Sequence, residues 1–163
     1  MNTSSRPGAG RTILLAGLVA GTLDILAAFT QFYINTGKNP MVVLRYIASA
    51  AVGKERAYDN STGMLLLGLL FHYLIAFGLT LFFFWLYPRV RFMQKSRILT
   101  AVVYGLFAWC ITNLVIVPLS LINKFPSNPK NMVIAALILI CMIGLPLAYI
   151  IGGYFDRRRG VGN

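Results

Sequence analysis

Four long apolar segments constrain this chain of 163 residues more than any other feature of its sequence. They cover residues 12–34, 63–87, 98–120 and 132–154. A helix needs about 20 mostly apolar residues to cross a bilayer, and each of the four segments is long enough. The sequence therefore predicts an all-α protein built as a bundle of four transmembrane helices.

The rest of the chain leaves no room for a second domain. The longest stretch outside the four segments is 35–62, which is too short to bury a core of its own. Hydrophobic residues make up 58% of the chain and its mean hydropathy is +0.72. We therefore expect residues 1–163 to form a single integral membrane domain.

The net charge of +11 needs an explanation, because in a soluble protein it would suggest binding to nucleic acid. Here the basic residues lie beside the ends of the apolar segments. In that position they orient the chain and contact anionic head groups. The expected partners are the lipid bilayer and the anionic lipids of its cytoplasmic face, and we expect no nucleic acid.

The distribution of basic residues predicts how the chain is threaded. With four spans, both termini lie on one side of the membrane, together with the loop 88–97. That side carries nine of the 15 basic residues: Arg6, Arg11, Arg89, Arg91, Lys95, Arg97, Arg157, Arg158 and Arg159. Cytoplasmic loops carry the excess of Lys and Arg, so the termini are predicted to be cytoplasmic. Aromatic residues at the ends of the spans, such as Tyr87 and Tyr154, are expected to anchor at the head groups.

A short apolar helix is predicted at about 40–52, between the first and second spans. Asn39 suits a helix N-cap and Pro40 the first helical position. A helix of this length reaches only about 20 Å, so it cannot span a bilayer. Arg45 and Ser49 are four residues apart and share one face. Two interpretations stay open: an interfacial helix whose Arg45 reaches water, or a re-entrant helix whose Arg45 points into the bundle.

Polar residues inside the spans predict a cluster at one depth. Asp24, His72 and Asn113 each lie seven to ten residues from the end of their span that faces away from the termini. A carboxylate within a span costs about 2.5–3.5 kcal/mol, so Asp24 needs a partner. His72 and Arg45 are the candidates of suitable charge. We predict a polar cluster, for binding or for structure, of Asp24, Arg45, His72 and Asn113.

Small residues recur at helical spacing in every span. Small side chains at intervals of four let helices approach closely in lipid, which predicts packing contacts. The glycines concerned are Gly17, Gly21, Gly68, Gly105, Gly144 and Gly152. Pro118 and Pro146 interrupt the last two spans, where we expect simple kinks rather than the lining of a cavity.

No motif predicts catalysis or cofactor binding. The chain has one histidine, and its two cysteines, Cys110 and Cys141, lie in separate spans without a CxxC pattern. No hydroxyl or thiol has a recognisable general base at helical spacing. We expect no enzyme activity, no metal and no cofactor.

Part of the chain, residues 68–119, resembles a known group of proteins. It contains Phe71-His72, the sequence Leu-Tyr-Pro-Arg at 86–89, Gly105, and Val-Pro-Leu at 117–119. These features resemble the YagU-like small inner-membrane proteins of bacteria, whose function is unknown. The resemblance implies a four-span bundle in the bacterial inner membrane, and it implies no activity.

Two functions fit these predictions. The first is a structural, assembly or partner-binding membrane subunit whose polar cluster fixes the helix register, in a homo-oligomer or with another membrane protein. The alternative is a small transporter or proton-relay protein. In that case Asp24 and His72 would exchange protons, since His titrates near neutral pH, with Arg45 as counter-ion or gate.

Overall fold

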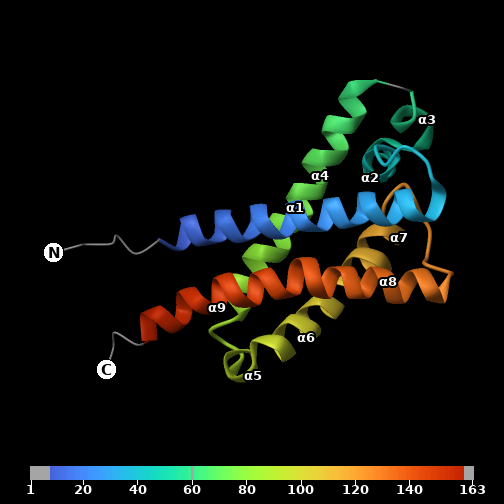
Figure 1. The fold of residues 1–163 in the computed structure, drawn as a ribbon. Helices are drawn as coiled ribbons and strands as arrows, with labels where there is room; N and C mark the ends of the chain where they lie inside the picture. The colour runs from blue at the N-terminus through green and yellow to red at the C-terminus, as the bar shows by residue number, and fades with distance from the viewer. Residues whose placement is uncertain (1–7, 60, 160–163) are drawn as a thin grey trace.

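A computed structural model describes residues 8–59 and 61–159 of the chain (Figure 1). These residues form helices and no strands. Four of the helices are long and apolar enough to cross a membrane: Ala9–Thr36, Thr62–Leu86, Arg97–Leu119 and Pro129–Arg159. The prediction of an all-α protein with four spans is therefore confirmed. The largest difference in bounds is at the last span, where the helix runs on through the basic residues to Arg159.

The first two spans are single helices, and the last two are each built of three consecutive segments. The first two are α1 (Ala9–Thr36) and α4 (Thr62–Leu86). The third span consists of α6 (Arg97–Cys110), η1 (Ile111–Ile116) and α7 (Val117–Leu119). The fourth consists of α8 (Pro129–Leu139), η2 (Ile140–Gly144) and α9 (Leu145–Arg159). Three short helices lie between spans: α2 (Val42–Val52), α3 (Lys54–Ala57) and α5 (Arg91–Lys95).

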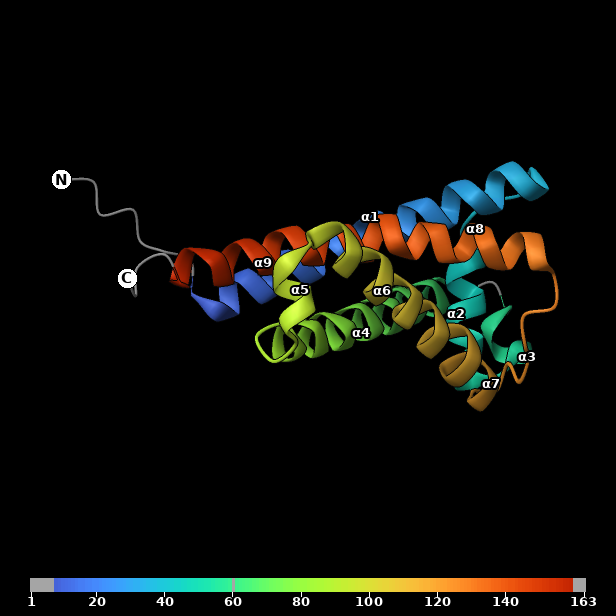
Figure 2. The same cartoon turned by 90° about the horizontal axis from the view of Figure 1, so that it is seen from below.

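The first span runs antiparallel to and alongside the fourth, and α4 crosses the first span at a steep angle (Figures 1 and 2). The third span packs against the fourth. The start of α1, the end of α9 and α5 lie at one end of the molecule, which we call the terminal end. The helices α2 and α3 and the loop from α7 to α8 lie at the opposite end, which we call the distal end.

All six glycines that the sequence places on packing faces touch another element. A Cβ added to Gly17 would meet the ring of Phe77, and one added to Gly21 would lie 3.0 Å from the ring of Tyr73. At three others the neighbour is main chain: Gly68 against Leu44, Gly105 against Ile140 and Gly144 against Ala101. Gly152 faces the Tyr87 hydroxyl, at 2.9 Å from such a Cβ. By contrast, a Cβ at Gly10, Gly78 or Gly153 would find nothing within 4 Å.

The chain widens into a π-helix just before each proline of the last two spans. In η1, the main-chain N–H of Val117 bonds to the carbonyl of Thr112, five residues back. In η2, Leu145 bonds to Ile140 in the same way. Pro118 and Pro146 follow directly, and because proline has no N–H the regular hydrogen-bond ladder cannot continue through them. The expected kinks are thus π-bulges, a form that places one extra residue in a helical turn.

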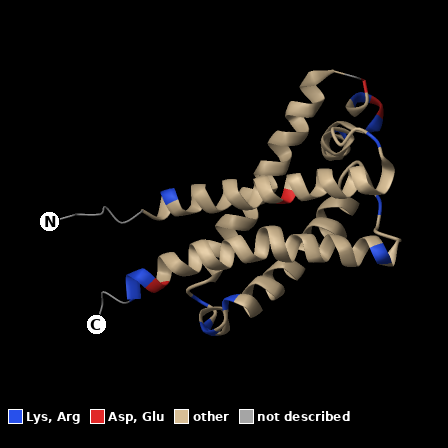
Figure 3. Cartoon of the chain, in the orientation of Figure 1, with Lys and Arg blue, Asp and Glu red and all other residues tan. Residues whose placement is uncertain are grey.

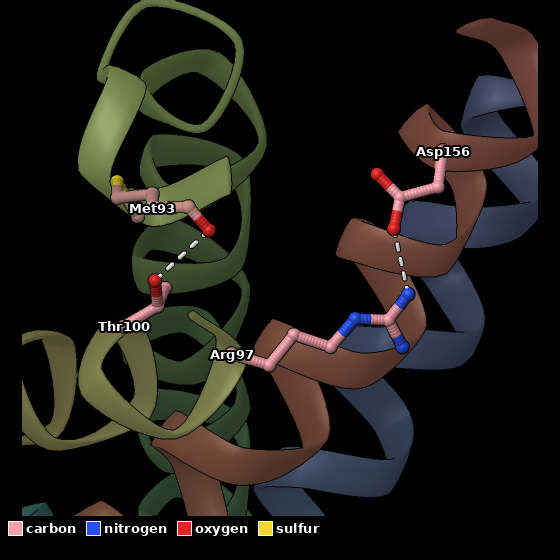
Figure 4. A network of polar contacts seen from close by, with 4 residues as sticks. All are labelled: Met93, Arg97, Thr100 and Asp156. Atoms are coloured by element: carbon pink, nitrogen blue, oxygen red, sulfur yellow. Dashed lines mark hydrogen bonds and ion pairs between the residues drawn. The ribbon is translucent and has the colours of Figure 1, made fainter. Parts of the chain in front are cut away.

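Hydrogen bonds fasten the start of the third span at the terminal end (Figure 4). The fully buried Thr100 hydroxyl donates to the Met93 carbonyl at 3.0 Å, which ties α6 to α5. Arg97 and Asp156 form an ion pair at 2.7 Å between the third and fourth spans. Both side chains are partly exposed, so we expect this pair to contribute at most about 1 kcal/mol.

Aromatic side chains fill the interior of the terminal end. Phe83 and Tyr104 meet edge to face, with ring centres 4.6 Å apart, and Tyr87 stacks on Phe155 at 5.5 Å. Tyr87 is 1% exposed and Tyr154 is 4% exposed. The expectation that these two tyrosines anchor at the head groups is therefore wrong. They pack because the small residues of the facing helices, such as Gly152, leave room for whole rings.

The contact of Gly68 with Leu44 gives a test of how α2 is held. Gly68→Ala would place a methyl group against the main chain of α2, and overpacking of this kind costs about 1–3 kcal/mol. Gly78→Ala is the matched control on the same helix, because its Cβ meets nothing and alanine favours helix by up to about 1 kcal/mol. We expect a lowered midpoint of thermal unfolding in detergent for Gly68→Ala alone. Equal midpoints for the two variants would contradict the contact.

Candidate functional site

His72 joins the first two spans through a buried hydrogen bond. Its ring is 8% exposed, and Nε2 lies 2.7 Å from the carbonyl oxygen of Gly21 on α1. A carbonyl can only accept, so Nε2 carries the proton and donates it. Beside this bond, the hydroxyls of Thr22 and Tyr73 lie 2.7 Å apart and link the same two helices. Small residues on α1 make both contacts possible, since Gly21 brings the helices close.

Asp24 lies one turn beyond Gly21 on the same helix and is half-buried. It is close enough to His72 for the charges of the two side chains to interact. Within residues 8–59 and 61–159, its carboxylate makes neither a hydrogen bond nor an ion pair with another side chain. Asp24 thus lies near the contact between His72 and Gly21, without a hydrogen-bond or ion-pair partner among the described side chains.

Arg45 has its partners at the distal end. Its Nη1 donates to the carbonyl of Ala57 at 3.2 Å, which ties α2 to α3. Its charge also acts on Asp59. Hydrogen bonds from Ser61 hold the pKa of Asp59 below its ordinary value, and the charges of Arg45 and Arg56 lower it further. In the described part of the chain, Arg45 forms no ion pair with Asp24.

Asn113 lies in the π-helical segment η1 of the third span. Its Nδ2 donates to the carbonyl of Trp109 at 3.1 Å, one turn back on the same helix. This bond occupies one donor of the amide and leaves its oxygen free to accept. Of the four polar residues predicted to cluster, Arg45 and Asn113 therefore bond to main-chain carbonyls of residues near them in the sequence, Ala57 and Trp109.

A cavity of about 620 Å³ opens at the distal end, and Asn113 lies in its wall. We call it the distal cavity. It is bounded by the end of α1, by α2, by η1 and α7, by the loop before α8, and by α8 itself. Its polar side chains include Gln31, Asn35, Asn113, Lys124, Asn128 and Asn131. Among its described lining residues there is no Asp or Glu, so the charge of the cavity is that of Lys124.

Sequence reasoning did not find this cavity. Its walls come from elements far apart in the chain, so no single helical face reveals it. One signal was available: Gln31 and Asn35 are four residues apart and continue the stripe of Asp24 and Ala28 along α1. The prediction that Pro118 marks only a kink also missed that the π-helix before it turns Asn113 toward the cavity.

Metal binding finds no support in the described residues. They contain no group of three or more His, Cys, Asp or Glu side chains that could hold an ion. Cys110 and Cys141 are both free and exposed on their spans. The charged and amide groups that line the distal cavity are the Lys124 ammonium group and the side-chain amides of Gln31, Asn35, Asn113, Asn128 and Asn131.

No protein-family model, no curated protein and no solved structure matches this chain.

The bond from His72 to Gly21 predicts a graded response to substitution. His72→Ala leaves a cavity and removes the donor, and we expect a loss of about 1–3 kcal/mol in the free energy of unfolding. His72→Gln keeps an N–H near the position of Nε2 and should recover part of that loss. Unfolding in detergent, followed by circular dichroism, measures both. If the two variants are equally destabilised, the hydrogen bond is not what His72 contributes.

Proposed function

We propose that this protein is a structural or assembly subunit of the bacterial inner membrane, and that it associates with a second copy through its third span. The observation that carries the proposal is the poor coverage of that span. Only 17% of its 18 most apolar consecutive residues are buried, compared with 28–33% in the other three spans. The uncovered residues Val103, Leu106 and Cys110 follow steps of three and four, and they form one face of α6.

The hydrogen bonds of the polar residues support a structural role. His72, Arg45 and Asn113 are each bonded to a main-chain carbonyl, as expected for polar side chains that fix the positions of helices. The bond from His72 Nε2 to the Gly21 carbonyl fixes α1 against α4. This bond supports a structural role for His72, and proton exchange by the same ring would have to use Nδ1.

A transport function remains the second candidate, because Asp24 lies beside His72 without a partner of its own among the described residues. In that case Asp24 would take up a proton or a small substrate from the distal side. The assembly proposal expects proton flux into liposomes to be unchanged by Asp24→Asn. A flux that the substitution abolishes would favour the transporter.

We further propose that the terminal end faces the cytoplasm. The basic residues of α5, of the start of α6 and of the end of α9 gather there (Figure 3). Arg6, which also entered this prediction, lies outside the described residues. A membrane-impermeant label added to intact cells should therefore react at the distal loops and leave the C-terminal residues unmodified. The short helix α2 would then lie in the periplasmic half, packed into the bundle through Leu44, Ala48 and Ser49, all of which are buried.

Natural cysteines make the association testable. In Cys141→Ser, the remaining Cys110 lies on the proposed interface, whereas in Cys110→Ser the remaining Cys141 lies on the fourth span. We expect oxidation in native membranes to give a disulfide-linked dimer with Cys141→Ser and none with Cys110→Ser. Leu106→Cys in a background without other cysteines should also form the dimer, since it shares the face of Cys110.

Two results would count against this interface. Equal dimer formation through Cys110 and Cys141 would indicate random collision in the membrane. If single cysteines on the third span all fail to give a cross-linked dimer, and the protein has the mass of a monomer in detergent, self-association is rejected. A cross-linked product of Cys110 with a different mass would instead identify another membrane protein as the partner.

A further inference from the structure

A second hollow lies on the other side of the seam between the first and fourth spans. It is a groove of about 550 Å³ between α1 and the helices α8 and η2, and we call it the side groove. Its walls are mostly apolar: Leu23, Leu26, Ala27, Ile134, Ile138 and Met142. Its position on the flank of two spanning helices means that it faces the hydrocarbon of the bilayer.

The distal cavity and the side groove meet at two residues. Gln31 and Asn35 line both hollows, because α1 turns one edge toward each of them. In this region α1 and α8 make few contacts with each other compared with α1 and α9. A molecule with a polar head and an apolar chain can therefore occupy both hollows at once, with its neck at Gln31 and Asn35.

The polar groups of the distal cavity select for negative charge. Lys124 supplies an ammonium group, and in the described part of the chain it forms no ion pair. The amides of Gln31 and Asn131 add donors. Trp109 also lines the cavity and is 9% exposed, and its buried indole N–H has no hydrogen-bond partner in residues 8–59 and 61–159. With no acidic side chain in the lining, an anion would meet donors and one positive charge.

We propose that the two hollows together bind one anionic phospholipid. Its phosphate lies in the distal cavity beside Lys124 and the amides, and one acyl chain lies in the side groove along Leu26 and Ile138. Charge-assisted hydrogen bonds hold the phosphate, and van der Waals contacts with the walls of the side groove hold the chain. This site is separate from the proposed interface on the third span, so either proposal can fail without the other.

Native mass spectrometry of the full chain tests the proposal with defined lipids. Protein purified in detergent is mixed with equal amounts of phosphatidylglycerol and phosphatidylethanolamine that carry the same acyl chains. We expect one phosphatidylglycerol molecule to be retained in preference to phosphatidylethanolamine, by about threefold or more, as for a single partly exposed ion pair. Lys124→Gln should remove this preference. Lys130→Gln is the matched control, because Lys130 is near in sequence but does not line the cavity.

The acyl chain needs its own variants. Ala27→Trp fills the side groove and should reduce the retention of both lipids, whereas Leu18→Trp, on an exposed part of α1 outside the groove, should not. Ile138→Trp fills the groove from the opposite wall and replaces Ala27→Trp if that variant does not fold. Size-exclusion chromatography and circular dichroism show which variants are folded.

Three results would overturn the proposal. Lys124→Gln and Lys130→Gln could behave alike, which would show that only surface charge matters. Ala27→Trp and Leu18→Trp could behave alike, which would show that the groove holds no chain. Finally, free glycerol 3-phosphate could bind with equal strength to the unsubstituted protein and to Ala27→Trp, which would show that the cavity takes a soluble phosphate rather than a lipid.

Discussion

The close approach of helix main chains at glycine is the constraint on which this structure depends. At Gly68, Gly105 and Gly144 the neighbour of the glycine is the backbone of another element, so any side chain would force the two apart. Such contacts matter in a bilayer, because lipid is as apolar as the helices and supplies little drive for them to associate. Close packing and hydrogen bonds between helices must therefore supply most of the free energy of association. Both require the helices to lie close to one another.

The polar contacts follow from this proximity. His72 reaches the carbonyl of Gly21 where α1 and α4 lie close, since a Cβ at Gly21 would already crowd Tyr73 and Ala76 of α4. At the terminal end, Gly152 leaves room for Tyr87, which then stacks on Phe155. Small residues thus create the space in which a buried imidazole and buried aromatic rings are accommodated.

Backbone irregularity shapes the other end of the molecule. The π-helical segments lie directly before Pro118 and Pro146, and the N–H of the residue before each proline bonds to the carbonyl five residues back. One of them carries Asn113 to the wall of the distal cavity. The loop that follows bonds to α2 through the N–H of Leu121 and the carbonyl of Ala50. Irregular backbone at such depth is tolerated where it lines a cavity within the protein.

Features that depend on a local pattern can be predicted from the sequence, whereas contacts between distant segments cannot. Length and hydropathy predict the four spans, because crossing a bilayer requires both within one segment. Spacing along a helix singles out the six glycines that touch other elements. The partner of Arg45 was not predictable from charge, since a carbonyl at Ala57 lies nearer than the carboxylate of Asp24. The burial of Tyr87 and the distal cavity both depend on how helices cross, which no single segment encodes.

The pair of contacts between the third and fourth spans gives the most direct test of this account. Gly105 lies against Ile140 and Gly144 against Ala101, so both contribute to one interface. The measurement is the free energy of unfolding in detergent for Gly105→Ala, Gly144→Ala and the double variant. We predict that each single change destabilises by about 1–3 kcal/mol. We also predict that the double variant loses less than the sum, because the first methyl group already separates the helices. Single changes that leave the stability unaltered would contradict the claim that close main-chain contact holds the bundle together.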